Sequence, residues 1–398
     1  MKHKISLTQA ANIYLDSQQL LTDNFNKGKT GTLEVIRHLG YIQIDTLAVV
    51  ARAHHHTLWS RTNDYKEHYL DELLSKDKTI FEYWSHAASY LPMNDYRFSL
   101  PRKKLFAEGK SHWFEQDKKM KKYVLDKIKA EGELQSKDFE DKIKRPGMWN
   151  WKPAKQSLEQ LFMEGKLMVA KRKGFQKVYD LTERVLPKDV NTKYPSEKEM
   201  AEHLIRMAIQ SSGIVNESEI AYLRGGMKQQ VIKAMNHLLK EGEIIEIAIE
   251  GIDKSKFITT KEKLSSADKI KSYSNNIKIL SPFDNAVIQR KRLQSLFNFD
   301  YMIECYLPEA KRKYGYFTLP ILYNNNFVAR LDPKADRATK TFYIKSIHFE
   351  KGFKINETFN KHFAEKIKQF ATFNGCESIV ITKADTKWKK EMKGLLKM

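Results

Sequence analysis

Apolar residues recur at helical spacing in three parts of the chain, and each run ends in a glycine followed by an apolar extended segment. The three glycines are Gly40, Gly165 and Gly242. Glycine suits the C-terminus of a helix because it adopts the left-handed backbone conformation that other residues resist. The repeated transition from helix to strand predicts an internal repeat over the first two thirds of the chain.

The second and third copies of this repeat carry further elements before the transition. The predicted helices are 118–131 and 137–143 in the second copy, and 196–211 and 217–223 in the third. Ser136 and Asn216 precede the shorter helices, where a side-chain oxygen caps the first turn. A β-hairpin follows each glycine. The order helix, short strand, helix, helix, hairpin is typical of a winged helix.

The N-terminal copy differs from the other two in the strand after its glycine. Helical spacing at 6–20 and 33–39 leads into a predicted strand at 41–46, with Gln43 and Asp45 where the other copies have apolar residues. Side chains alternate along a strand, so this pair shares one face, roughly 6.5–7 Å apart. An amide and a carboxylate at that separation can hold one water, which the carboxylate deprotonates. A functional site is one interpretation of the pair, and a solvated strand face is the other.

Strand-like alternation replaces the repeat beyond Ser265. Predicted strands are 277–280, 301–307, 316–323, 327–331, 342–349 and 378–382, with one helix at 357–372. We therefore expect an α+β protein with three tandem winged-helix motifs and a C-terminal β-barrel-like domain. The expected domains are 1–115 with the candidate catalytic strand, 116–190 with a basic wing, 191–264, and 265–398 with a helix and a basic tail.

The charge balance narrows the class of partner. The chain has 70 Lys and Arg against 49 Asp and Glu, a formal charge of +21 spread along its length. Such a field attracts polyanions, of which nucleic acid is the usual one. No apolar run reaches the roughly 18 residues of a membrane span, and the N-terminus does not resemble a secretory signal. Cys305 and Cys376 have no metal-ligand spacing, which indicates reduced thiols in a cytoplasmic protein.

Several cationic residues are candidate DNA contacts. Lys171, Arg172 and Lys173 precede Gly174 at the tip of the second hairpin, where they would lie on phosphates or serve solubility. Arg61 is either a phosphate contact or a polar core residue. The run His54–His56 does not predict a metal site, because adjacent helical positions do not converge on one ion.

An ordered set of short motifs resembles the AlkZ/YcaQ-like (AlkX-type) winged-helix DNA glycosylases, from about residue 5 to about residue 350. The matching segments are 39–45, 55–61, 81–92, 174–181, 280–284, 297–304, 313–317 and 330–337. The family motif of Gln, a hydrophobic residue, then Gln or Asp falls on Gln43 and Asp45, and the Asp form resembles the branch with broad crosslink and monoadduct repair. The family often has Trp-Asp before its arginines. Ile288-Gln289 stand here instead, which weakens the DNA contact expected of Arg290.

The resemblance implies a monofunctional glycosylase that hydrolyses the N-glycosidic bond of N7-alkylated purines and unhooks interstrand crosslinks. The resemblance implies that Gln43 and Asp45 are the catalytic pair. It implies that the partner is double-stranded DNA with alkylated or crosslinked bases, and that the protein acts in the cytoplasm at the bacterial nucleoid. A monomer without cofactor or metal is expected, with no membrane partner. A non-enzymatic winged-helix regulator of transcription is the main alternative, although it has no need of the polar pair. An RNA-processing factor is supported by the charge alone.

Overall fold

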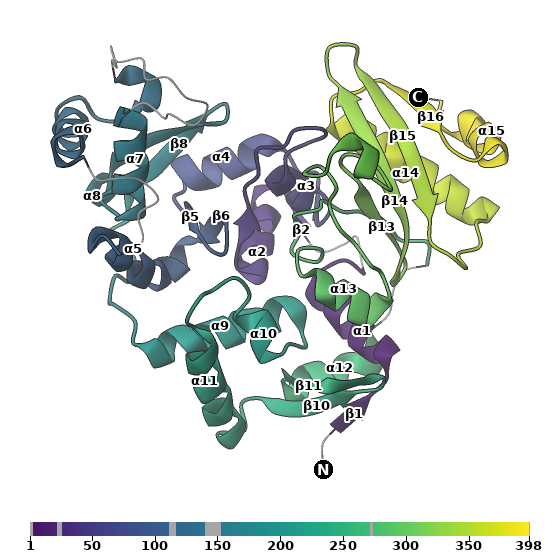
Figure 1. The fold of residues 1–398 in the computed structure, drawn as a ribbon, viewed down its shortest axis with the longest axis horizontal. Coiled ribbons are helices and arrows are strands. Elements are labelled where there is room, and N and C mark those ends of the chain that lie inside the picture. The colour runs from purple at the N-terminus through teal and green to yellow at the C-terminus, as the bar shows by residue number, and fades with distance from the viewer. Residues whose placement is uncertain (1–2, 22–25, 111–116, 140–152, 271–273, 398) are drawn as a thin grey trace. The chain divides into compact units, whose positions relative to one another are not determined.

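The computed structural model describes residues 3–21, 26–110, 117–139, 153–270 and 274–397 (Figure 1). The chain forms two compact units, and each draws on separate stretches of sequence. The first unit comprises Met1–Lys27, Ile42–Tyr65 and Ala201–Met398, and the second comprises Gly28–Tyr41 and Lys66–Met200. The fold is mixed α and β in both units, as predicted.

The first unit holds most of the elements. Its helices are α1 (Leu7–Ser17), α3 (Ala53–Trp59), α9 (Glu197–Ser212, which begins at the end of the second unit), α10 (Glu217–Ile220), α11 (Lys228–Lys240), α12 (Lys261–Ser266), α13 (Arg290–Phe297), α14 (Glu357–Phe373) and α15 (Thr386–Leu395). Its strands are β1 (His3–Ile5), β2 (Asn26–Lys27), β3 (Ile42–Gln43), β4 (Thr62–Asn63), β10 (Ile245–Ile249), β11 (Ile252–Thr259), β12 (Ile277–Ile279), β13 (Leu319–Tyr323), β14 (Asn326–Asp336), β15 (Thr341–Phe349) and β16 (Ser378–Lys383).

The second unit contains the elements predicted for the second copy of the repeat. Its helices are α2 (Gly28–Leu39), α4 (Glu67–Ser75), α5 (Leu100–Ala107), α6 (Lys118–Glu131), α7 (Pro153–Met163) and α8 (Thr182–Val185), and its strands are β5 (Ile80–Trp84), β6 (Ala88–Pro92), β7 (Leu134–Gln135), β8 (Leu167–Lys173) and β9 (Gln176–Leu181). The long helix α6 and the hairpin β8–β9 confirm the prediction. The predicted helix at 137–143 lies mostly outside the described residues, and only a 3-10 turn at Ser136–Asp138 is seen.

The third copy follows its prediction closely. Helices α9, α10 and α11 lead into the hairpin β10–β11. Asn216 caps α10 by accepting from the backbone N–H groups of Ser218 and Glu219, and the Glu219 side chain accepts in return from the Asn216 N–H. This reciprocal capping satisfies donors that a helix start leaves unpaired. Helix α10 ends at Ile220, three residues earlier than expected.

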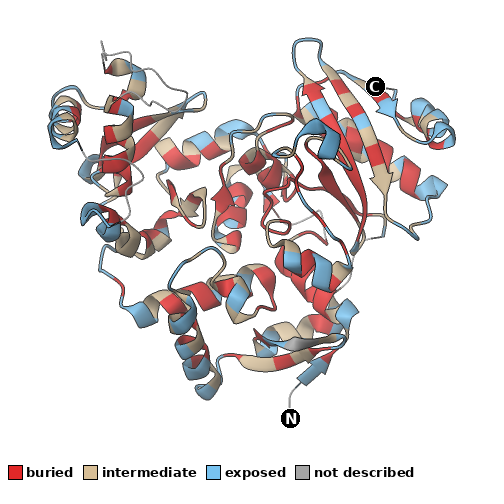
Figure 2. Ribbon diagram, in the orientation of Figure 1, coloured by how far each residue is buried: buried red, intermediate tan, exposed pale blue. Residues whose placement is uncertain are grey.

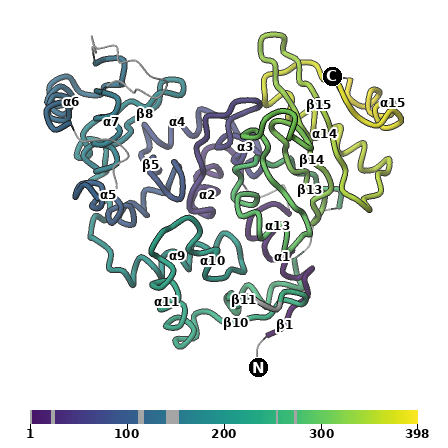
Figure 3. The backbone as a smooth tube through the Cα atoms, in the orientation of Figure 1, coloured from purple at the N-terminus to yellow at the C-terminus, as the bar shows by residue number. Residues whose placement is uncertain are grey.

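The N-terminal helix packs against distant parts of the first unit. Ser6 caps α1 by accepting from the Gln9 N–H at 3.1 Å. Ile13 and Tyr14 join one core with Ile247 of β10 and Leu293 of α13, and α1 lies beside α13 (Figure 3). Strand β1 pairs in parallel with β10 in the same unit.

The C-terminal elements form an open sheet, and the predicted barrel is wrong. Its five strands follow the order β12-β13-β14-β15-β16, so β12 and β16 are its two edges among the described residues. Phe342 and Ile344 of β15 share a buried core with Phe359 and Phe363 of α14, which covers one face (Figure 2). The segment at 301–307, predicted as a strand, is irregular. No helix among the described residues has both the length and the apolar character to cross a bilayer.

Candidate active site

Asp45 lies on an irregular segment between β3 and α3, not within a strand. The predicted strand at 41–46 ends at Gln43, so alternation does not set the direction of Asp45. A local turn sets it instead, because the Asp45 Oδ1 accepts from the Leu47 N–H at 2.8 Å. Short polar side chains form such turns readily. The carboxylate is therefore held in place by its own backbone.

Half-burial makes the Asp45 carboxyl a stronger base than a free aspartate. Removal from water raises its pKa, while hydrogen bonds from the backbone N–H groups of Leu47 and Thr46 lower the pKa by less. Desolvation disfavours the charged form, and a base with a raised pKa takes up a proton more readily. Gln43 is buried, with 8% of its surface exposed. Its pairing with Asp45 around one water stays a prediction.

Cys305 and Tyr306 lie close to Asp45, and the sequence did not indicate them as site residues. Burial raises the pKa of the Cys305 thiol and of the Tyr306 hydroxyl, and the negative charge of Asp45 raises both pKa values further. Tyr306 is 73% exposed, so an aromatic ring beside Asp45 is open to solvent. The sequence signal that points toward them is the adjacent Glu304, the last residue of the motif at 297–304, in a segment that the alternation predicts to be a strand.

Two buried carboxylates, Glu304 and Asp332, hold the backbone at 314–317, a short distance after Tyr306 in the chain. Glu304 accepts from the backbone N–H groups of Tyr314 at 2.8 Å and Gly315 at 3.1 Å. Asp332 of β14 accepts from Phe317 at 3.0 Å. Gly315 has a φ of +143°, and a Cβ there would lie 2.4 Å from the Asp332 Cγ. Only glycine fits at position 315. The hydrogen bonds to Glu304 and Asp332 fix the backbone at 314–317 next to the Cys305–Tyr306 segment.

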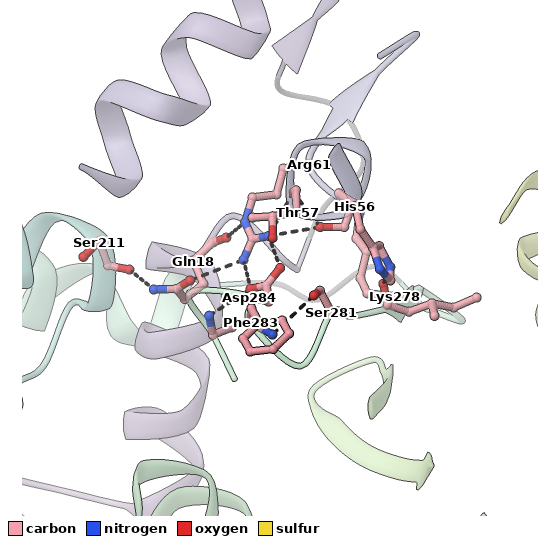
Figure 4. A network of polar contacts seen from close by, with 12 residues as sticks. Gln18, His56, Thr57, Arg61, Ser211, Lys278, Ser281, Phe283 and Asp284 are labelled. Carbon is pink, nitrogen blue, oxygen red and sulfur yellow. Dashed lines mark hydrogen bonds and ion pairs between the residues drawn. The ribbon is translucent and has the colours of Figure 1, made fainter. Parts of the chain in front are cut away.

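Arg61 forms a buried ion pair with Asp284 in the first unit (Figure 4). The two guanidinium nitrogens lie 2.7 Å and 2.8 Å from the Asp284 carboxylate oxygens, and the Arg61 Nε donates to the Gln18 carbonyl at 2.8 Å. Both side chains have 0% exposed surface. Of the two roles left open for Arg61, the structure supports the polar core residue, since a guanidinium without exposed surface meets no phosphate in this conformation.

Two residues of the histidine run, His54 and His56, are also buried in the core. The His56 Nε2 lies 2.9 Å from the Ile279 carbonyl, and burial lowers the pKa of His56 to about 4. The imidazole is therefore neutral near pH 7. His54 is buried as well. Among the described residues, no cluster of three or more His, Cys, Asp or Glu side chains could hold a metal ion.

Comparison with known proteins identifies the family. A family model described as DNA glycosylase AlkZ-like matches residues 36–373. The chain belongs to the AlkZ-like family of DNA glycosylases. The structure of Streptomyces sahachiroi DNA glycosylase AlkZ has a similar fold, with a TM-score of 0.62 at 14% identity over 95% of this chain and 100% of that one. The resemblance drawn from the motifs is confirmed.

The β8–β9 hairpin, which the sequence predicts to be a wing, carries its three cations in different surroundings. Lys171 is ion-paired with Glu133. Arg172, whose side chain is 6% exposed, binds Glu82, whose side chain is 1% exposed, through Nε at 2.9 Å and a terminal nitrogen at 2.8 Å. Lys173 is exposed at the tip. Lys173 is thus the best placed of the three to contact phosphate, while Arg172 stabilises the fold.

Single substitutions should separate these two roles. Arg172→Gln leaves Glu82 with Lys177 at 3.6 Å, so we expect the free energy of unfolding to fall by about 3 kcal/mol, near the lower end for a broken buried pair. Lys173→Gln should leave unfolding unchanged and weaken binding to damaged and undamaged duplex alike, reducing the salt slope by about 0.9. Urea unfolding and fluorescence anisotropy over a salt series measure the two effects. Loss of binding confined to damaged DNA would contradict a phosphate contact by Lys173.

Arg290 begins α13 and is half-buried. Its positive charge lowers the pKa of Tyr301, although burial is the larger effect and raises that pKa overall. A DNA contact by Arg290 stays a prediction.

Proposed function

We propose that this AlkZ-like chain is a monofunctional glycosylase that hydrolyses the N-glycosidic bond of N7-alkylated purines and unhooks interstrand crosslinks. The observation that carries the proposal is the Asp45 carboxylate, which is half-buried, raised in pKa and oriented by the Leu47 N–H. A regulator that only binds DNA would not need a base with these properties.

The chemistry starts from a substrate that already carries a good leaving group. Alkylation at N7 makes the guanine base cationic, so the bond from C1′ to N9 breaks with its electron pair moving to the base. Positive charge grows on the sugar, and the Asp45 carboxylate stabilises it. Asp45 then takes a proton from water as the water oxygen bonds to C1′. The products are a neutral base and an abasic sugar.

Gln43 is the positioning residue in this proposal. Its amide offers both a donor and an acceptor, so it can orient a water without competing for the proton. Its burial restricts the side chain and favours one orientation. No lysine is assigned a Schiff-base role, so the abasic strand remains intact after base release.

Recognition of duplex DNA rests on the charge and on the helix and hairpin elements. The formal charge of +21 supports binding to phosphates. We interpret α6–β9 and α9–β11 as two of the three predicted winged helices, with β8–β9 and β10–β11 as wings. The expected substrate is duplex DNA carrying alkylated or crosslinked bases, bound by a monomer in the bacterial nucleoid.

An oligonucleotide treated with a nitrogen mustard tests the proposal. We expect strand scission only when alkali follows incubation with the protein, because hydrolysis leaves an alkali-labile abasic site. The rate should fall as pH drops through the raised pKa of Asp45, above the ordinary value of 3.8, because only the ionised carboxylate accepts the proton. Reactions without protein correct for spontaneous loss of the base. Scission without alkali would indicate a lyase, and no scission in either condition would reject base release.

A further inference from the structure

The outer face of the C-terminal sheet carries a groove of about 990 Å³. Side chains of β14 and β15 line it together with residues from 309–316 and from 382–385. Strand side chains alternate, so Tyr343 faces away from the core that its neighbours Phe342 and Ile344 share with α14. The groove and α14 therefore lie on opposite faces of the sheet. All of these residues belong to the first unit.

Cationic side chains and aromatic rings both line this groove. Its cationic lining residues are Arg312, Lys313, Lys334, Lys345 and Lys383. The Arg312 guanidinium lies 4.9 Å from the centre of the Tyr316 ring, and the Lys313 ammonium lies 5.0 Å from that of Tyr314. Lys334, Lys345 and Lys383 are exposed. The Arg330 guanidinium also lies 4.4 Å from the centre of the Tyr314 ring. Cations therefore already cover Tyr314 and Tyr316, and Tyr343 is the lining tyrosine best placed to stack with a planar group.

Three of the acidic lining residues are occupied by backbone donors. Asp332 accepts from Phe317 at 3.0 Å, and Asp336 accepts from Ala338 at 3.2 Å. Asp385 caps α15 by accepting from the N–H of Lys387 at 3.0 Å. These carboxylates are directed into turns and caps. Asp336 also lies 4.0 Å from the Lys334 ammonium, in a partly exposed ion pair that contributes little and that a phosphate can replace. Glu309 is the fourth acidic residue of the lining, on the exposed rim.

The groove borders the segment that carries Asp45. The Ala335 N–H donates to the Val49 carbonyl at 2.9 Å, and Ala335 stands between two lining residues, Lys334 and Asp336. Val49 is four residues after Asp45, so their Cα atoms are at most about 14 Å apart. One DNA strand could reach both places.

We infer that this groove binds a single DNA strand next to the nucleotide that reacts at Asp45. Phosphates lie against Lys334, Lys345 and Lys383, and a base stacks on Tyr343. Proteins that hold single strands combine a cationic track with aromatic faces, whereas a duplex hides its base faces and meets only the cations. The inference rests on the proposed function for the identity of the reacting nucleotide. The test of DNA binding does not depend on that function.

Charge reversal tests the cationic track. The triple variant K334E/K345E/K383E should bind a fluorescent, undamaged oligothymidylate at least about 10-fold more weakly, and the salt slope should fall by about 2 because each lost phosphate contact contributes about 0.7. The matched control K351E/K354E/K361E makes the same charge change at exposed lysines outside the groove and should differ much less from the parent. Unchanged affinity and slope in the groove variant would overturn the inference.

Two further measurements address the stacking and the strandedness. Tyr343→Ala should weaken binding of the oligothymidylate about 10-fold and Tyr343→Phe should not, because the ring supplies the stacking face. An equal loss by the triple variant on a duplex of the same length would assign a duplex surface and overturn the single-strand inference. If the groove does not bind a single strand, the rate of base release by the parent protein is unaffected. If the parent releases no base, the affinities measured here are unaffected. The two results therefore distinguish failure of the groove inference from failure of the proposed function.

Discussion

Asp45→Asn should lower the rate of base release from N7-alkylguanine by at least about 100-fold, because it removes the group that takes the proton from water. The amide oxygen of asparagine can still accept from the Leu47 N–H, as the Asp45 Oδ1 does at 2.8 Å. The side chain therefore keeps its direction and loses its basicity. Single-turnover release from a mustard-treated oligonucleotide measures the effect.

Stability and DNA binding are the controls for this substitution. A raised pKa means that the fold disfavours the charged form of Asp45, so the neutral asparagine should unfold at the same temperature as the parent or a higher one. Affinity for undamaged duplex should be unchanged. If Asp45→Asn still releases the base at the parental rate, Asp45 is not the general base.

Arg61→Met should produce the largest loss of stability, about 3–5 kcal/mol in the free energy of unfolding. It leaves the Asp284 carboxylate without its ion-pair partner at a site where both side chains have 0% exposed surface. The cost is the burial of an uncompensated charge, which exceeds the attraction that the pair itself supplies. Urea denaturation followed by circular dichroism measures it.

Two comparisons isolate the charge as the cause. The double variant Arg61→Met with Asp284→Asn should be more stable than Arg61→Met alone, because no unpaired charge remains. Lys340→Met breaks the ion pair between Lys340 and Glu377, whose side chains are 58% and 71% exposed, respectively. This substitution should change the free energy of unfolding little. If Arg61→Met cost no more than Lys340→Met, the buried pair would not support the fold.

Elements with local causes could be predicted from the sequence. Asn216 caps α10 as expected, and α6 begins and ends at the predicted residues. The glycines that end α2 and α7, Gly40 and Gly165, both have positive φ. Capping, helical periodicity and backbone freedom act over a few residues, so one sequence contains all the information they need.

Partners far apart in the chain could not be predicted. Arg61 meets Asp284, which is 223 residues away, and Arg172 meets Glu82. Because of these partners, the two arginines stabilise the fold, although the sequence predicts DNA contacts for them. The local sequence around each arginine does not indicate its acidic partner. Alternation along a predicted strand puts Asp45 on the same face as Gln43, but the strand ends at Gln43. The direction of Asp45 depends on a turn that a period-two pattern does not show.

The discontinuous composition of the first unit has a consequence for folding during synthesis. Strand β1 pairs with β10, with His3 opposite Ile247, so the N-terminal strand waits for a partner made 244 residues later. At roughly 5–20 residues per second on the ribosome, that interval is about 12–50 s. The segment with Asp45 belongs to the same unit, whose largest part, Ala201–Met398, emerges last. A nascent chain therefore completes its candidate catalytic unit only after Ala201–Met398 has been synthesised.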